Sequence, residues 1–233
     1  MPATLHLLCA GAAQVLVKTL EARLLAEAGA TLDARFGAVG AMKEALLAGA
    51  ACDLMVTTDK MVGELAEAGL LRGDTRAALG RVRTGVAVCS GAPRPDVGTP
   101  EALKAVLLAA DAVYFPDALR STAGIHFAAV LRQLGIHDQL QARFRTFPNG
   151  ATAMRELALH GTPRSIGCTQ VSEIKYTAGV ELVALLPARF ELATTYTAAV
   201  SATAAEPALA GRFIVMLTGG DTRALRAEAG FEN

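Results

Sequence analysis

The chain has 233 residues, and its 22 lysines and arginines equal its 22 aspartates and glutamates, so its formal net charge is zero. That balance gives no long-range field to attract nucleic acid or an anionic membrane, and with no tryptophan a base-stacking surface is not expected either. No apolar run reaches the roughly 20 residues that span a bilayer, and the four cysteines form no CxxC pair. We therefore expect no nucleic-acid partner, no membrane insertion, no metal and no cofactor.

A strand is expected at residues 4–8, followed by an elbow of small residues that enters a helix near Val15. Such an elbow leaves backbone N–H groups unpaired at the positive end of the helix dipole, which makes it an anion site. Small side chains let a ligand approach the main chain closely. The elbow has no lysine and lacks the six-residue glycine fingerprint of nucleotide loops. The candidate donors are the main-chain groups of Ala10, Gly11 and Ala12.

The same pattern of strand, elbow and helix returns twice. A strand at residues 31–36 leads through a second small-residue elbow, Ala38, Val39 and Gly40, to a helix at 41–47. A strand at 53–57 precedes a helix at 60–68, with residues 58–59 as its cap. Residues 80–85 are expected to break the pattern before a new strand at 86–89. The alternation predicts an α/β protein with parallel strands.

Three polar clusters follow in the middle of the chain. Arg120, Ser121 and Thr122 open a helix after a strand at 112–115, and this set of donors suits a carboxylate. Asn149 opens a helix that runs to residue 160, and Thr169 and Gln170 lie at the carboxyl end of a short buried strand expected at 165–169. Each cluster has a plainer interpretation: the hydroxyls and the amide cap their helices, and Arg120 is solvated.

The last third completes the alternation. Strands are expected at 180–185 and 192–200, the second of them rich in threonine, and helices at 207–217 and 222–229. Tyr196 lies in the threonine-rich strand, where it could donate to a ligand or pack on the sheet.

The order of these elements and elbows resembles the type II periplasmic binding-protein fold, in its molybdate-binding-protein-like branch. The resemblance implies two α/β lobes, each a mainly parallel sheet flanked by helices, with the ligand in a cleft between them. It places residues 1–82 and 194–233 in the first lobe and 83–193 in the second, joined by two hinge crossovers.

The chain departs from molybdate binders at the first two elbows. In those proteins the elbows typically offer serine hydroxyls to the oxyanion, whereas here neither elbow carries a hydroxyl. Backbone N–H groups survive any side-chain change, but each lost donor around a desolvated oxyanion costs about 1–3 kcal/mol. We therefore expect a small anion other than molybdate, in particular an organic di- or tricarboxylate.

Two functions follow from the resemblance. One is a solute-binding protein that closes on its ligand without changing it; the other is an isomerase, tautomerase or dehydratase of small carboxylic acids, because some relatives of the fold, aconitate isomerase among them, are enzymes. For an enzyme, the proton carriers would come from Cys9, His126 and Tyr196. A thiol above a helix N-terminus would have a lowered pKa, although a small buried thiol is the plainer interpretation of Cys9.

The start of the chain bears on this choice. No signal segment is visible before the first strand, which predicts a cytoplasmic protein as the sequence stands, or a periplasmic one whose signal has been removed. A permease of an ABC transporter would be a partner only for an exported protein.

Overall fold

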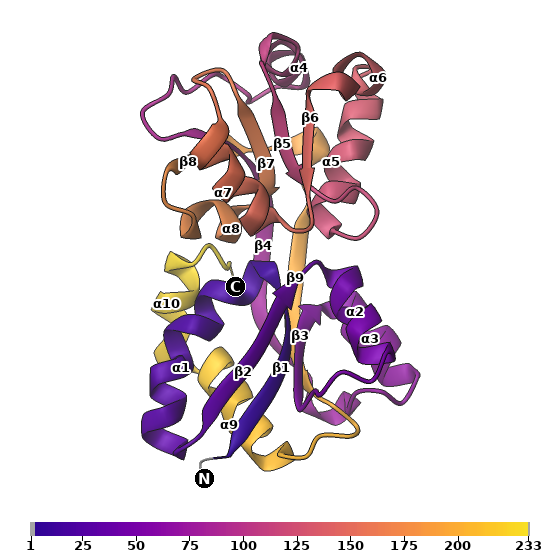
Figure 1. Cartoon of the computed structure of the whole chain (residues 1–233), viewed down its shortest axis with the longest axis vertical. Coiled ribbons are helices and arrows are strands. Elements are labelled where there is room, and N and C mark those ends of the chain that lie inside the picture. The colour runs from indigo at the N-terminus through magenta and orange to yellow at the C-terminus, as the bar shows by residue number, and fades with distance from the viewer. Residues whose placement is uncertain (1–2, 233) are drawn as a thin grey trace. The chain divides into compact units, whose positions relative to one another are not determined.

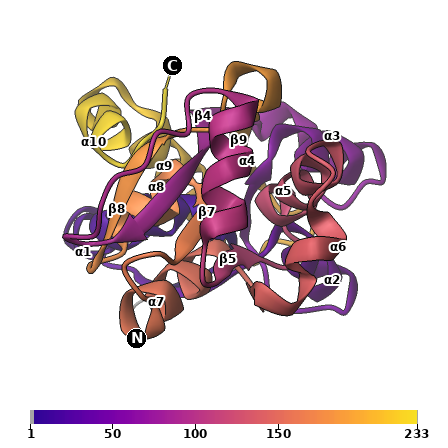
Figure 2. The same ribbon diagram turned by 90° about the horizontal axis from the view of Figure 1, so that it is seen from above.

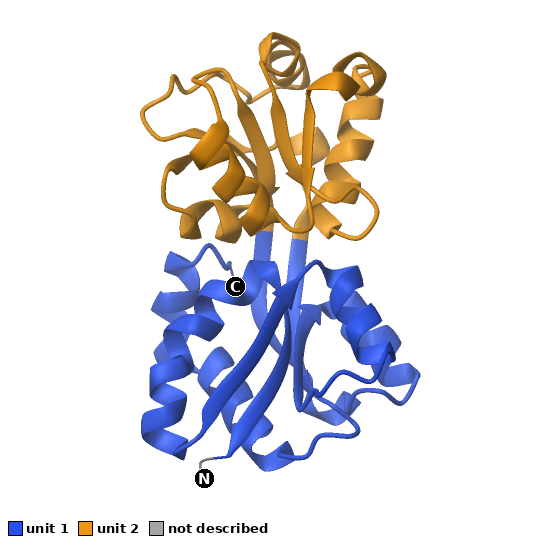
Figure 3. Ribbon diagram, in the orientation of Figure 1, with its two compact units in different colours: residues 1–82, 194–233 blue, residues 83–193 orange. Residues whose placement is uncertain are grey.

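The computed structural model describes residues 3–232, and the chain forms two compact units (Figure 3). Unit 1 comprises residues 1–82 and 194–233, and unit 2 comprises residues 83–193. The chain passes between the units twice, within β4 (Ala77–Cys89) and at the start of β9 (Ala193–Val200). Each unit is a sheet covered by helices, which confirms the predicted two-lobed α/β class. Between residues 3 and 232 no helix is long and apolar enough to cross a membrane.

The sheet of unit 1 has the strand order β2-β1-β3-β9. β1 is parallel to both β2 and β3, and β9 is antiparallel to β3. In Figure 1, α2 and α3 lie on one side of this sheet, and α1 and α9 on the other. The buried side chains of Leu8, Met55 and Ala199 pack under α2 and α3. The bounds are β1 Thr4–Ala10, β2 Thr31–Gly37, β3 Leu54–Thr58, α1 Gln14–Ala28, α2 Val39–Leu47, α3 Asp59–Glu67, α9 Pro207–Thr218 and α10 Arg223–Glu228.

The sheet of unit 2 joins β4, β7, β5 and β6 in that order, and β8 pairs with the other edge of β4. β5, β6 and β7 are parallel to one another, whereas β4 is antiparallel to β7. Val113 and Phe115 face α4 and α5, and Tyr114 faces α7 and α8. Helix α5 lies beside α6 in both views (Figures 1 and 2). The bounds are β5 Val113–Pro116, β6 Phe144–Phe147, β7 Ile166–Gln170, β8 Val180–Leu185, α4 Pro100–Ala109, α5 Thr122–Gln133, α6 His137–Leu140, α7 Gly150–His160 and α8 Val171–Tyr176.

The predicted break at residues 80–85 is wrong, because β4 runs through it without interruption. Its two glycines mark close packing, not the end of a strand. A Cβ on Gly80, which has φ +134°, would lie 2.6 Å from the carbonyl oxygen of Glu232. A Cβ on Gly85 would lie 2.6 Å from Cδ1 of Leu182 on the neighbouring strand. The strand needs glycine at both positions so that its neighbours can approach.

Candidate functional site

The elbows of unit 1 lie side by side because their strands are parallel and in register. Ala10, the last residue of β1, pairs with Gly37, the last residue of β2. Cys9 also pairs with Val56 on β3. The carboxyl ends of the three strands therefore meet at one edge of the sheet, and the chain turns into a helix after each of them. This is the edge at which ligands bind in open α/β sheets.

The first two elbows of this edge have no side-chain cap. Ala10 precedes a 3-10 turn (Gly11–Ala13) that leads into α1, and Ala38 is the N-cap of α2, so neither can cap its helix. The first helical bond of α2 runs from the N–H of Met42 to the carbonyl oxygen of Ala38, at 3.0 Å. The N–H groups of Val39 and Gly40 precede that bond, so the helix itself gives them no acceptor. The third elbow differs, since Thr58 caps α3 by accepting from the N–H of Met61 at 3.3 Å.

In unit 2 the N-terminus of α5 is also left without a side-chain cap. Ser121 occupies the N-cap position and is buried, but its hydroxyl makes no capping bond. The carboxylate of Asp117 shapes the loop before it, accepting from the N–H groups of Leu119 at 2.7 Å and Arg120 at 3.1 Å. A Cβ on Gly124 would clash with the carbonyl oxygens of residues 116 and 117, so the first turn of α5 packs tightly on this loop. Plain N-capping, the alternative interpretation of Ser121, is therefore wrong for that hydroxyl.

The difference between a capping and a non-capping helix-start residue can be tested by its effect on stability. Thr99 caps α4 by accepting from the N–H of Ala102 at 3.1 Å. We expect Thr99→Ala to lower the free energy of unfolding by about 1 kcal/mol, the usual loss for a cap. Ser121→Ala should leave it unchanged within about 0.5 kcal/mol, because no cap is lost. Urea denaturation of both variants measures the difference, and equal losses would mean that Ser121 does cap its helix.

The N-terminus of α7, by contrast, is filled from within the protein. The Oδ1 atom of Asn149 accepts from the N–H of Thr152 at 2.8 Å. The carboxylate of Glu173 accepts from the N–H of Ala151 at 3.3 Å and from the hydroxyl of Thr169 at 2.6 Å. Burial raises the pKa of Glu173, and these hydrogen bonds oppose the shift. Asn149 and Thr169 thus have partners inside unit 2, which counts against both as ligand donors.

The sequence prediction missed Glu173. Its position between buried residues of a short helix is the one feature of the sequence that could have indicated a buried carboxylate. Spacing alone could not show that its carboxylate reaches a helix N-terminus more than twenty positions earlier in the chain, because β7 and the intervening loop set that distance.

The remaining ligand candidates differ in exposure. Arg120 is exposed in the loop before α5, and Thr122 is half-buried at the first position of that helix. Gln170 is buried at the N-cap of α8. Tyr196 is buried on β9, where its ring contacts that of Phe231 edge-on with centroids 6.2 Å apart.

The structure separates the candidate proton carriers. Cys9 is fully buried and its thiol donates to the carbonyl oxygen of Ala10 at 3.3 Å. Burial raises the pKa of Cys9 well above its ordinary value, so the lowered pKa considered for it is wrong. His126 is half-buried, with Nε2 2.8 Å from the carbonyl oxygen of Phe190. Because a carbonyl only accepts, Nε2 is the donor in this contact.

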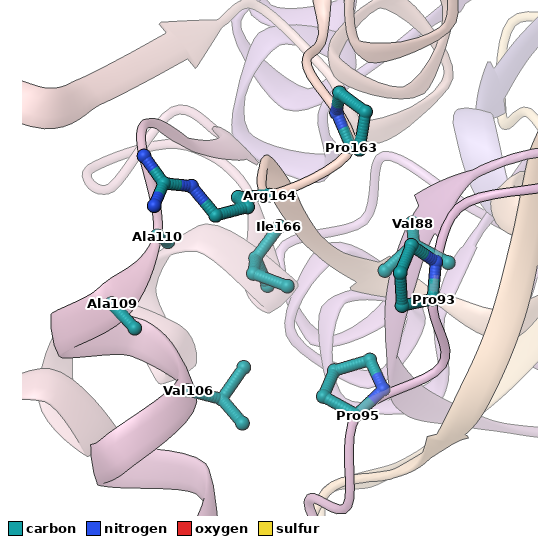
Figure 4. A pocket seen from close by; sticks show the side chains of 9 residues that line it. All are labelled: Val88, Pro93, Pro95, Val106, Ala109, Ala110, Pro163, Arg164 and Ile166. Carbon is teal, nitrogen blue, oxygen red and sulfur yellow. The ribbon is translucent and has the colours of Figure 1, made fainter.

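Unit 2 also contains a cavity of about 190 Å³ near the start of β7 (Figure 4). Its one charged lining residue, Arg164, forms an ion pair with Asp111. The other lining side chains are apolar: Val88, Pro93, Pro95, Val106, Ala109, Ala110, Pro163 and Ile166. A cavity of this lining does not suit an anion. Nor do the described residues contain a cluster of three histidine, cysteine, aspartate or glutamate side chains that could hold a metal ion.

Residues 5–232 match the family model described as bacterial extracellular solute-binding protein. The chain belongs to this solute-binding protein family. The solved structures that resemble the chain, a molybdate-binding protein among them, share its fold. The match includes both elbows of unit 1 and the N-terminus of α5.

The chain is similar to the aconitate isomerase of a Pseudomonas species, with 25% identity over 181 residues. The aligned region covers 77% of this chain and 67% of that protein. The periplasmic molybdate-binding protein of Azotobacter vinelandii is 18% identical with a TM-score of 0.81, over 98% of this chain and 99% of that one. L-phospholactate-bound PEB3 is 12% identical with a TM-score of 0.70, over 98% and 99% of the two chains; PEB3 comes from Campylobacter jejuni. These structural likenesses establish the fold.

Proposed function

We propose that this protein binds a small organic carboxylate, with two or three carboxyl groups, through the uncapped helix N-termini of its elbows. The observation that carries the proposal is that side chains cap α3, α4 and α7, whereas no side chain caps the turn after Ala10, α2 or α5. An uncapped N-terminus offers N–H groups and the positive end of a helix dipole to an anion. Ser121 and Thr122 add hydroxyls beside the N–H groups of α5.

The donors favour a carboxylate over a tetrahedral oxyanion. A carboxylate presents two oxygens, which a pair of main-chain N–H groups can satisfy. A molybdate or sulfate presents four, and the elbows after β1 and β2 carry only alanine, glycine and valine. Each oxyanion lone pair left unpaired in a desolvated site would weaken binding, so the side-chain donors absent from these elbows disfavour the tetrahedral ligand.

A ligand screen tests the proposal. The unfolding temperature would be measured with succinate, citrate, tricarballylate, molybdate and sulfate, and NMR would follow each compound that stabilises the protein. We expect stabilisation by di- or tricarboxylates that stay chemically unchanged. Stabilisation by molybdate or sulfate alone would overturn the ligand assignment.

A single main-chain donor can be removed from the α2 elbow. Val39 is the first residue of α2, and proline fits the first helical position, as Pro100 and Pro207 already do in this chain. Ala38 has φ −64° and ψ 151°, the extended conformation that a residue before proline requires. Val39→Pro should weaken carboxylate binding about tenfold or more, because a hydrogen bond to a charged group contributes roughly 1.5–3 kcal/mol.

The matched control is Val39→Ala, which trims the same side chain and keeps the N–H group. Calorimetric titration of both variants with the best carboxylate separates the two effects. Equal losses of affinity would mean that the side chain, and not the main-chain donor, contributes to binding.

A second candidate function is the isomerisation of a small carboxylic acid, favoured by the 25% identity to an aconitate isomerase. Of the three predicted proton carriers, His126 is best suited, because it is half-buried, whereas Cys9 and Tyr196 are buried. The reaction would move a proton and a double bond within the ligand, so the NMR measurement above detects it. New ligand resonances that are absent with His126→Gln would show that the protein is an enzyme and not a binding protein.

The location and partners of the protein depend on the same choice. A binding protein for import would act outside the cytoplasm and deliver its ligand to an ABC transporter permease, whereas an enzyme needs neither. We propose the permease partner only for an exported form of the chain.

A further inference from the structure

Glu173 carries a buried carboxylate whose two oxygens accept hydrogen bonds from nearby donors. Its side chain is 6% exposed on α8. The hydroxyl of Thr169 donates to Oε2 at 2.6 Å, and the N–H of Ala151 donates to Oε1 at 3.3 Å. Burial raises the pKa of Glu173, and the nearby main-chain N–H groups of Gly150 and Gln170 act in the opposite direction. Main-chain N–H groups cannot accept, so this environment matches an ionised carboxylate.

These contacts fill the first turn of α7. The N–H of Ala151 donates to Glu173, the N–H of Gly150 lies near the same carboxylate, and the N–H of Thr152 donates to the side chain of Asn149. The next N–H, that of Ala153, already donates to the carbonyl oxygen of Asn149 within the helix. The first turn of α7 therefore already has acceptors within unit 2.

The main chain is shaped to admit this carboxylate. A Cβ on Gly150 would clash with Oε2 of Glu173 and with Oγ1 of Thr169. Because glycine has no Cβ at this position, the carboxylate of Glu173 can approach the N-terminus of α7 closely. Helices α7 and α8 pack against each other and against β7, which holds the carboxylate in place (Figure 1).

We propose that Glu173 is a built-in anion that occupies the donor site at the N-terminus of α7 and thereby determines specificity. Among the longer helices of unit 2, Thr99 caps α4 and Glu173 fills the α7 site, which leaves the N-terminus of α5 to receive an anionic group of the ligand. The statement about specificity rests on the proposed binding of a carboxylate, whereas the occupation of the α7 site by Glu173 does not. Removal of the carboxylate should open the α7 site to an external anion of the same shape.

Chemical rescue tests the occupation of the site. Glu173→Ala leaves the N–H of Ala151 and the hydroxyl of Thr169 without their acceptor, around a space of carboxylate size. Formate should raise the unfolding temperature of this variant saturably, by about 3 °C more than that of the control variant Glu228→Ala, which loses an exposed carboxylate in unit 1. Formamide, a neutral molecule of similar size, should have no such effect. An equal response of the two variants to formate would overturn the proposal.

A second variant covers the case in which Glu173→Ala does not fold. Glu173→Gln keeps the volume but places an NH₂ group among donors. The amide proton resonances of Gly150 and Ala151 should move upfield in this variant, as expected for the loss of a charge-assisted hydrogen bond, while that of Ala102 at the Thr99 cap stays in place. Unchanged resonances of Gly150 and Ala151 would refute the proposed role.

Selectivity tests the second half of the proposal. The ratio of the affinities for a tricarboxylate and the matching dicarboxylate should rise in Glu173→Ala, in which the space at the α7 N-terminus is vacated, relative to the unsubstituted protein, and an unchanged ratio would refute the role in specificity. A protein that binds no carboxylate would refute the proposed function, while formate rescue of Glu173→Ala would still establish the occupied site.

Discussion

Gly150→Ala is expected to lower the free energy of unfolding by about 3 kcal/mol, the sum of overpacking and lost buried hydrogen bonds. The new Cβ would clash with Oε2 of Glu173 and Oγ1 of Thr169. Both atoms belong to flexible side chains, but both are buried in one hydrogen-bonded group and cannot move without breaking it. Urea denaturation followed by circular dichroism measures the loss.

Another glycine-to-alanine substitution in the chain should change the free energy of unfolding in the opposite direction and serves as a control. Gly211 lies inside α9, and a Cβ there would meet nothing within 4 Å. Gly211→Ala should therefore raise the free energy of unfolding by up to about 1 kcal/mol, the difference in helix propensity. If Gly150→Ala also proved neutral or stabilising, the carboxylate of Glu173 would not be held tightly against the N-terminus of α7.

Asp53→Ala is expected to cost about 3 kcal/mol of unfolding free energy, because it leaves three partly buried N–H groups without their acceptor. The carboxylate of Asp53 is 2% exposed in unit 1. Its Oδ1 atom accepts from the N–H groups of Ala205 and Glu206 just before α9, at 2.7 and 3.0 Å, and its Oδ2 atom accepts from the N–H of His6 on β1, at 2.8 Å. It thus joins the start of α9 to the sheet.

Asp53→Asn provides the graded control for this prediction. The amide keeps one acceptor oxygen, which can serve Ala205 and Glu206, but turns an NH₂ group toward the N–H of His6. Its loss of stability should be about half that of Asp53→Ala. Thermal and urea denaturation of both variants check the order. Equal losses would mean that the acceptor oxygens do not determine the effect.

Much of the fold could be predicted from the sequence because local patterns specify its elements. Alternating strands and helices, small-residue elbows and helix-start residues such as Thr99 act over a few positions. The β-rich run that became β9 and the closing helix α9 were confirmed with boundaries within a residue or two. The prediction of a break at residues 80–85 was wrong because the sequence does not distinguish a glycine required by a close neighbour from a glycine at a turn.

The candidate site was predictable only in part, for a similar reason. The elbows after β1 and β2 were located by their small residues, since a main-chain donor needs no particular side chain. Ser121 and Asn149 looked alike as helix-start residues, yet the Asn149 side chain caps its helix and the Ser121 hydroxyl does not. That distinction depends on side-chain rotamers and on what packs nearby.

By itself, then, the amino-acid sequence determined an α/β chain of alternating elements with anion-binding elbows, because hydrophobic period and small residues act locally. The tertiary structure alone decided that Ser121 leaves α5 uncapped while Asn149 and Glu173 fill the N-terminus of α7. Glu173 reaches Ala151, 22 positions away in the chain, and Asp53 reaches Ala205, 152 positions away. No local pattern records such distances, because only the packing of sheet and helices brings these carboxylates to the helix ends that they close.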